Sequence, residues 1–127
     1  MTAAKQTLID RIESYYAAVD DLDPDPIVGH FTANATMVIA TGDVRHVGRE
    51  AIRGTYERRK NSVDQSFHGD FTHVVDAENS RAATRLAVRR TSKGGESIEM
   101  DCIALFTFEG ELIKHIVIWM SGENSLK

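Results

Sequence analysis

Hydrophobic residues recur at helical spacing near the start of the chain. Five of them are separated by 4, 3, 4 and 3 residues, which predicts an amphipathic helix. An aspartate-rich run at 20–24 ends this helix. The dipeptide Asp25-Pro26 then suits the start of a short second helix that runs through Phe31. The residues that carry the first helical stripe are Leu8, Ile12, Tyr15, Val19 and Leu22.

The next segment predicts a short hairpin and a third helix. Residues 35–40 form an apolar strand, 41–43 a turn and 44–47 a return strand. Gly48 opens a helix that carries Ile52 and Tyr56 one turn apart and ends near residues 60–61.

The second half of the chain changes to strand periodicity. Four β-branched or alternating runs are separated by short turn signals, which is typical of an antiparallel meander. The sequence therefore predicts one α+β domain over residues 1–127. In it a cone-shaped, curved antiparallel sheet wraps around three N-terminal helices with an open pocket at its mouth. The predicted strands are 67–75, 81–90, 98–108 and 112–120.

Composition narrows the class of partner. Hydrophobic residues make up 42% and charged ones 27%, which is typical of a folded domain. Fifteen basic against 19 acidic side chains give a net charge of −4, which argues against nucleic acid. The longest apolar stretch, nine residues at 112–120, is too short for a bilayer. The N-terminus lacks a secretory signal and Cys102 is the one cysteine, so we expect a cytoplasmic protein without an internal disulfide.

Several strings resemble the nuclear transport factor two-like superfamily, and within it the SnoaL-like and ketosteroid-isomerase-like branch. The resemblance covers nearly the whole chain and implies the cone fold. It does not settle the chemistry, because one fold hosts many functions. The strings are YYAAVD at 15–20, FTANAT at 31–36, GREAI at 48–52 and WMS at 119–121.

Ketosteroid isomerase activity itself is not expected from this resemblance. The family's oxyanion tyrosine falls on Tyr15, and two supporting tyrosines fall on Tyr56 and on Phe31. The base aspartate, however, falls near Ile39 and the oxyanion aspartate on Ala104, and neither side chain transfers a proton.

A second set of residues resembles those of hexachlorocyclohexane dehydrochlorinase and scytalone dehydratase. Their strand histidine falls on His73, and the helix aspartate that orients it in the dehydrochlorinase falls on Asp20. A carboxylate beside an imidazole fixes its tautomer and stabilises the imidazolium that forms when it takes a proton. Tyr15 and Tyr16 then supply the donor to a developing oxyanion.

Strand alternation, combined with the same resemblance, divides the last two strands into two faces. The sets that contain Ala104 and Trp119 are expected to face the pocket. The opposite face stays apolar, which predicts a homodimer packed sheet to sheet. The predicted substrate-binding residues are Tyr16, Tyr56, Phe31, Met100, Cys102, Phe106, His115 and Trp119. The predicted dimer face consists of Ile103, Leu105, Ile116, Ile118 and Met120.

Other chemistries lack the residues they need. No histidine spacing fits a metal site, and His68 and His73, five apart on one strand, are expected on opposite faces. No phosphate loop occurs, so no cofactor is expected. The basic run 58–60 is interpreted as a solvated helix face, and Cys102 has no nearby cation to stabilise a thiolate. Asp101 points outward, which disfavours an epoxide hydrolase.

Two functions remain open. The first is a cofactor-free lyase, isomerase or cyclase that acts on a small, largely apolar substrate, with His73 as base, Asp20 as its partner and Tyr15 as donor. The second is a module of the same fold that binds a ligand or mediates assembly without catalysis.

Overall fold

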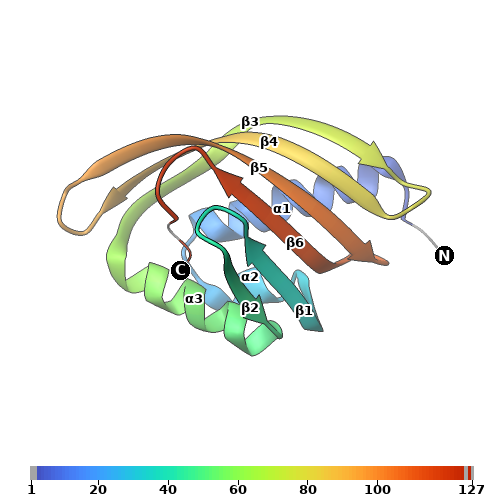
Figure 1. Cartoon of the computed structure of the whole chain (residues 1–127), viewed down its shortest axis with the longest axis horizontal. Coiled ribbons are helices and arrows are strands. Elements are labelled where there is room, and N and C mark those ends of the chain that lie inside the picture. The colour runs from blue at the N-terminus through green and yellow to red at the C-terminus, as the bar shows by residue number, and fades with distance from the viewer. Residues whose placement is uncertain (1–2, 125, 127) are drawn as a thin grey trace.

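The computed structural model describes residues 3–124 and residue 126. These residues form one six-stranded sheet in the order β2-β1-β6-β5-β4-β3, and the sheet curves over three helices (Figure 1). No helix among them is long and apolar enough to cross a membrane. The helices are α1 (Lys5–Asp20), α2 (Pro24–Val28) and α3 (Arg49–Ser62). The strands are β1 (Phe31–Ile39), β2 (Val44–Val47), β3 (Val63–Asp76), β4 (Arg81–Ser92), β5 (Ser97–Glu109) and β6 (Leu112–Met120).

The predicted α+β class and the meander of four long strands are confirmed. Each of β3, β4, β5 and β6 pairs antiparallel with the next. The sheet is nevertheless mixed, because β6 returns beside β1 and runs parallel to it. The sequence pattern could not predict this parallel pair, because β1 and β6 are far apart in sequence and the spacing of residues within a strand does not show in which direction a distant strand runs beside it.

Helix α1 places the first candidate site residues. Its apolar stripe, Leu8, Ile12, Tyr15 and Val19, is fully or almost fully buried against the sheet. The helix ends at Asp20, and Leu22 beyond it takes a positive φ of 60°. Packing of the stripe thus fixes the end of α1, and with it Asp20, against the concave face of the sheet.

The second helix is shorter than the sequence predicts. Asp23 accepts a hydrogen bond from the backbone N–H of Asp25 at 3.1 Å and caps a helix that ends at Val28. Phe31 is therefore not helical and begins β1, which starts four residues before the predicted strand at 35. Spacing alone did not locate this strand start, because the pairing of β1 with β6 is irregular between Phe31 and Thr36.

The predicted face of β6 is wrong. Ala104 pairs with Ile118 and Ile103 pairs with Trp119, and residues paired directly across two strands lie on the same face. Register shifts by one residue between Thr107 and Phe108, opposite Lys114, which inverts the assignment of the β6 side chains from His115 to Met120 but leaves Ile113 buried. Ile116 and Ile118 are consequently buried in the core, and Met120 lies on the inner face with them rather than on the predicted dimer face.

Candidate functional site

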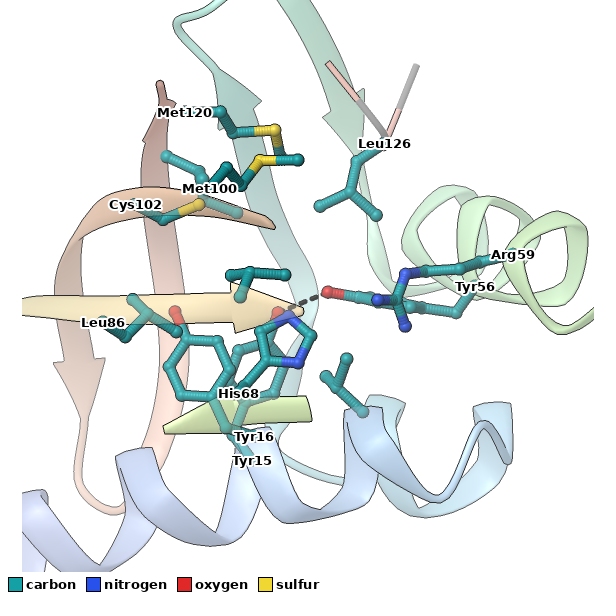
Figure 2. Close-up of a pocket in the computed structure, with 13 residues that line it drawn as sticks. Tyr15, Tyr16, Tyr56, Arg59, His68, Leu86, Met100, Cys102, Met120 and Leu126 are labelled. Carbon is teal, nitrogen blue, oxygen red and sulfur yellow. Dashed lines mark hydrogen bonds between the residues drawn. The ribbon is translucent and has the colours of Figure 1, made fainter. Parts of the chain in front are cut away.

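A pocket lies between α1, α3 and the inner face of the sheet, at one end of the concave side (Figure 2). Its polar lining comes from the two helices and β3, and its apolar wall from β4, β5, β6 and the C-terminal segment. The polar side chains are Tyr15, Tyr16, Tyr56, Arg59 and His68. The apolar wall includes Leu86, Met100, Cys102, Ile118, Met120 and Leu126.

The pocket is narrow. Its cavity volume is about 30 Å³. Two of its wall residues, Met100 and Met120, have flexible unbranched side chains that adapt easily to a ligand. The cavity thus combines a small volume with a wall that can widen, and its chemistry comes from a few polar groups at one side.

The carboxylate of Asp20 pairs with His68 and not with His73. The His68 Nδ1 and Asp20 Oδ1 atoms are 2.6 Å apart. Asp20 also accepts the backbone N–H of His68 at 2.9 Å and the hydroxyl of Ser66 at 2.9 Å. Because an ionised carboxylate only accepts hydrogen bonds, the imidazole hydrogen lies on Nδ1. No described residue bonds to Nε2, which remains a basic nitrogen on a ring that lines the pocket.

A bulge in β3 explains why His68 and His73 do not lie on the opposite faces that alternation predicted. Between Gly69 and Thr72 the strand advances three residues while its partner β4 advances two, and Asp70 takes a φ of 54°. The extra residue brings His68 and His73 onto the same, helix-facing side, where alternation had predicted opposite faces. His73 instead bonds to Glu13 and to Thr84, each at 2.8 Å, and is not among the pocket-lining residues.

The surroundings of His68 favour its neutral form. Burial lowers the pKa of His68 below its usual 6.5, against the opposing effect of its hydrogen bond to Asp20, and Arg59 and Arg90 lower it further. The imidazole is therefore unprotonated at pH 7. Tyr16 stacks on the ring with centroids 5.3 Å apart, and together with Asp20 it fixes the orientation of the imidazole.

Tyr15 and Tyr56 form a hydroxyl pair at the floor of the pocket. Their two hydroxyl groups hydrogen-bond to each other, and the side chains come from α1 and α3 (Figure 2). Burial raises the pKa of both phenols, so both keep their protons at neutral pH. One hydroxyl donates to the other, and the second is then free to donate to an oxygen atom in the pocket.

Arg59 is a pocket residue that the sequence pattern does not predict. The basic run at 58–60 predicts a solvated helix face, but the Arg59 side chain is buried, with an exposed fraction of 5%. Its Nη2 donates to the Ser66 hydroxyl at 3.1 Å, and that hydroxyl donates to Asp20. The spacing of Ile52, Tyr56 and Arg59, at intervals of 4 and 3, is the signal that could have placed Arg59 on the buried face of α3.

The structure places some of the predicted pocket-wall residues at the pocket and others away from it. Met100 and Cys102 line the pocket, and burial raises the pKa of the Cys102 thiol to about 11, so this cysteine is not a thiolate nucleophile at neutral pH. Phe31 and Phe106 do not line the pocket themselves, but both rings pack edge-on against Tyr15 and hold its ring in place. Two other predicted residues lie on the outer face because of the β6 register: His115 bonds to Thr36, and Trp119 is 45% exposed.

Within residues 3–124 and residue 126, no group of three or more histidine, cysteine, aspartate or glutamate side chains is placed to hold a metal ion. The chemistry that the described groups can perform is proton transfer. His68 supplies a base, Asp20 a carboxylate that orients it, and the tyrosine pair a neutral donor.

Comparisons with solved structures give the same fold. A polyketide cyclase candidate from Xanthomonas campestris pv. campestris is 17% identical, with coverage of 91% of this chain and 90% of that chain and a TM-score of 0.80. The pinacolase BvnE from Penicillium brevicompactum is 18% identical, with coverage of 95% and 88% and a TM-score of 0.82. A protein with a ketosteroid isomerase-like fold from Catenulispora acidiphila is 17% identical, with coverage of 92% and 88% and a TM-score of 0.78.

The comparison with curated proteins found no match. The family model described as the SnoaL-like domain, in contrast, matches residues 12–116, which include the second half of α1, all of α2 and α3, and the sheet as far as the middle of β6. The chain therefore belongs to the SnoaL-like domain family.

Proposed function

We propose that this SnoaL-like domain is a cofactor-independent enzyme that abstracts a proton from a small, mainly apolar substrate. The observation that carries the proposal is the His68–Asp20 pair, with the imidazole hydrogen directed to the carboxylate and a basic Nε2 in the pocket. The base expected from the sequence, His73, is thereby replaced by His68.

The proposed step breaks a C–H bond next to a carbonyl group. Its proton goes to Nε2 of His68, and its electron pair moves to the carbonyl oxygen to form an enolate. Asp20 stabilises the imidazolium, and a hydroxyl of the Tyr15–Tyr56 pair donates to the enolate oxygen. Return of the proton to another carbon completes an isomerisation. Loss of a leaving group or attack on a second carbonyl gives a lyase or a cyclase.

The name of one structural neighbour, a polyketide cyclase candidate, is compatible with this class of reaction. At 17% identity that neighbour is related to this chain by fold alone. A non-catalytic module that binds a ligand or mediates assembly is the second candidate. The small cavity volume favours its assembly form, since pockets for drug-sized ligands reach about 300 Å³ or more.

Deuterium incorporation from D₂O separates the two candidates. The protein is incubated with small ketones and oxo acids, including cyclohexanone and 4-oxopentanoate, and proton NMR follows loss of the signal beside the carbonyl group. We expect the protein to accelerate exchange in at least one compound above the rate in buffer. Binding of these compounds without any accelerated exchange would support the non-catalytic candidate instead.

We also propose that the chain forms a homodimer through the outer face of the sheet, as expected from the sequence, but with a revised set of residues. Ile103, Leu105 and Trp119 form neighbouring exposed positions there, at 49%, 39% and 45% exposure, with Ile103 paired to Trp119 across β5 and β6. Exposed apolar side chains grouped in this way usually mark an interface.

The dimer proposal predicts a change of mass in solution. Sedimentation velocity of the unmodified chain should report twice the mass of one chain, and Trp119→Glu should report one, because a charge at the centre of an apolar interface is unpaired when buried. Val47→Glu is the control, since Val47 is exposed on the edge strand β2. A monomeric unmodified chain, or a dimer that persists in Trp119→Glu, would contradict the proposal.

A further inference from the structure

The guanidinium group of Arg59 is buried with unused hydrogen-bonding capacity. Its Nη2 bonds to Ser66, but its Nη1 is shielded from solvent and has no hydrogen-bond partner among the described residues. No described carboxylate lies within 4 Å of the group to form an ion pair. A buried cation without a counterion is costly, so its retention in a pocket points to a ligand that satisfies it.

The nearest protein anion is already engaged. Asp20 accepts three hydrogen bonds, two from His68 and one from Ser66, and reaches Arg59 only through the Ser66 hydroxyl. The Asp20 carboxylate therefore offsets one positive charge of the site, but its oxygen atoms accept hydrogen bonds from His68 and Ser66 and not from Arg59. The Nη1 hydrogens of Arg59 are left for another acceptor.

A second guanidinium adds to the positive charge. Arg90 is half-buried on β4, forms no ion pair among the described residues, and lies close enough to Arg59 that this neighbour, after burial, lowers the pKa of Arg90. Arg90 is not among the residues that line the pocket, but it adds to the charge around it. With a neutral His68, Arg59 and Arg90 contribute two positive charges against the one negative charge of Asp20. The resulting local charge of +1 is opposite in sign to the net charge of −4 for the whole chain.

Arg59 is also placed to meet a ligand. It extends from α3 toward the side of the pocket that holds His68 and the tyrosine hydroxyl groups, while the opposite wall is made of Met100, Met120 and Leu126 (Figure 2). An occupant that touches both sides must be polar and anionic at one end and apolar at the other. Guanidinium groups match planar carboxylates because their N–H donors lie in one plane.

We propose that the pocket binds a small organic carboxylate, with a carboxylate oxygen accepting a hydrogen bond from Nη1 of Arg59 and the apolar body lying against Met100 and Met120. The inference deepens the proposed function by naming the class of its substrate, and it rests on that function only for the claim that the bound anion reacts. It makes the ligand predicted from the sequence, a small and largely apolar one, more specific by adding a carboxylate group.

Isothermal titration with charged and neutral ligands of the same shape tests this binding mode. The probes are benzoate with benzamide and trans-cinnamate with trans-cinnamamide. We expect at least one carboxylate to bind the unmodified protein about 10-fold or more tightly than its amide, as a charge-assisted hydrogen bond in a buried site provides. Equal affinities within both pairs, or no binding of either carboxylate, would overturn the proposal.

Substitution of Arg59 supplies the second arm. Arg59→Met is expected to abolish the preference for the carboxylate and to leave the melting temperature unchanged or higher, because it removes a buried cation without a counterion. Arg58→Met is the matched control, since Arg58 is the exposed neighbour on the same helix, and it should keep the preference. A preference that survives in Arg59→Met would refute the assignment, and a melting temperature that falls sharply would show that Arg59 is structural.

The outcome is separable from that of the catalytic proposal. His68→Gln removes the proposed base but leaves Arg59 in place, so the preference for benzoate or cinnamate should persist in this variant. If carboxylates bind but no compound exchanges deuterium, the proposed catalytic function is contradicted and the proposed ligand class is supported. If exchange occurs only in neutral ketones and carboxylates bind no more tightly than their amides, the catalytic function is supported and the ligand class is contradicted.

Discussion

Replacing His68 with glutamine is expected to lower the rate of deuterium incorporation by about 10²- to 10⁴-fold. Glutamine keeps an N–H donor for the Asp20 carboxylate, which His68 Nδ1 contacts at 2.6 Å, but it has no basic nitrogen to take a proton. The loss should appear in kcat more than in KM, because the base acts in the transition state and does not hold the ground-state substrate.

His73→Gln is the matched control for this substitution. His73 lies on the same strand and the same side of the sheet and also contacts a carboxylate, that of Glu13, but it does not line the pocket. We expect exchange in His73→Gln within about 2-fold of the unmodified rate, because the amide can replace the imidazole in its contacts with Glu13 and Thr84 and the residue does not line the pocket. Equal losses in both variants, or a loss in His73→Gln alone, would show that His68 is not the base.

Asp20→Asn is expected to reduce the same rate by about 100-fold, as is typical when the partner that orients a functional histidine is altered. The amide no longer offers two acceptor oxygens to the Ser66 hydroxyl, the His68 backbone N–H and the His68 ring, so the ring loses its fixed tautomer. The same change removes a charge that raises the pKa of His68.

The pH profile distinguishes this role from a purely structural one. The base is active when unprotonated, so kcat/KM should fall on the acid side as pH drops through the pKa of His68, which burial holds below 6.5. Without the Asp20 charge that pKa decreases, and the acid limb should move to lower pH while the plateau falls. Asp21→Asn, an exposed neighbour, should move neither. A plateau that stays at the unmodified level, or a limb that moves to higher pH, would contradict the assignment.

Local patterns were sufficient for most of the fold. The 4-3-4-3 spacing that starts at Leu8 predicted α1, and alternating runs separated by turns predicted β4, β5 and β6 to within two residues, because both signals are contained within one element. Strand β3 begins at Val63, four residues before its predicted start at 67. The face of β6 was not predictable in this way. It depends on the register with β5, where a one-residue shift at Thr107 and Phe108 places Trp119 outside and Ile118 inside.

The candidate site was predicted in part for the same reason. Tyr15, Tyr56 and Asp20 were identified on elements without irregularities, and they lie in or beside the pocket. The histidine partner of Asp20 was assigned to His73 from the family resemblance, whereas in the structure Asp20 contacts His68. Alternation could not show that both histidines face the helices, because the extra residue in β3 between Gly69 and Thr72 shifts it by one. A positive φ at Asp70, a residue type that tolerates it, is a feature of the bulge that alternation does not reveal.

Arg59 shows a different limit of sequence interpretation. A basic run is usually a solvated face, and two of the three residues in 58–60 are indeed exposed. The third is buried because it follows Tyr56 by three residues, and the face of α3 that carries Tyr56 packs toward α1 and the sheet. Helical phase therefore overrides composition at this position, and the buried cation it creates is the group that suggests an anionic ligand.

The protonation state of His68 tests the central claim most directly. A ¹⁵N NMR titration of the uniformly labelled protein, with His68→Gln to assign the signals, reports which ring nitrogen carries the hydrogen and at what pH the ring is protonated. We expect a neutral ring at pH 7 with hydrogen on Nδ1, a basic Nε2 and a pKa below 6.5. A hydrogen on Nε2, or a ring that is protonated at pH 7, would contradict the role of His68 as the base.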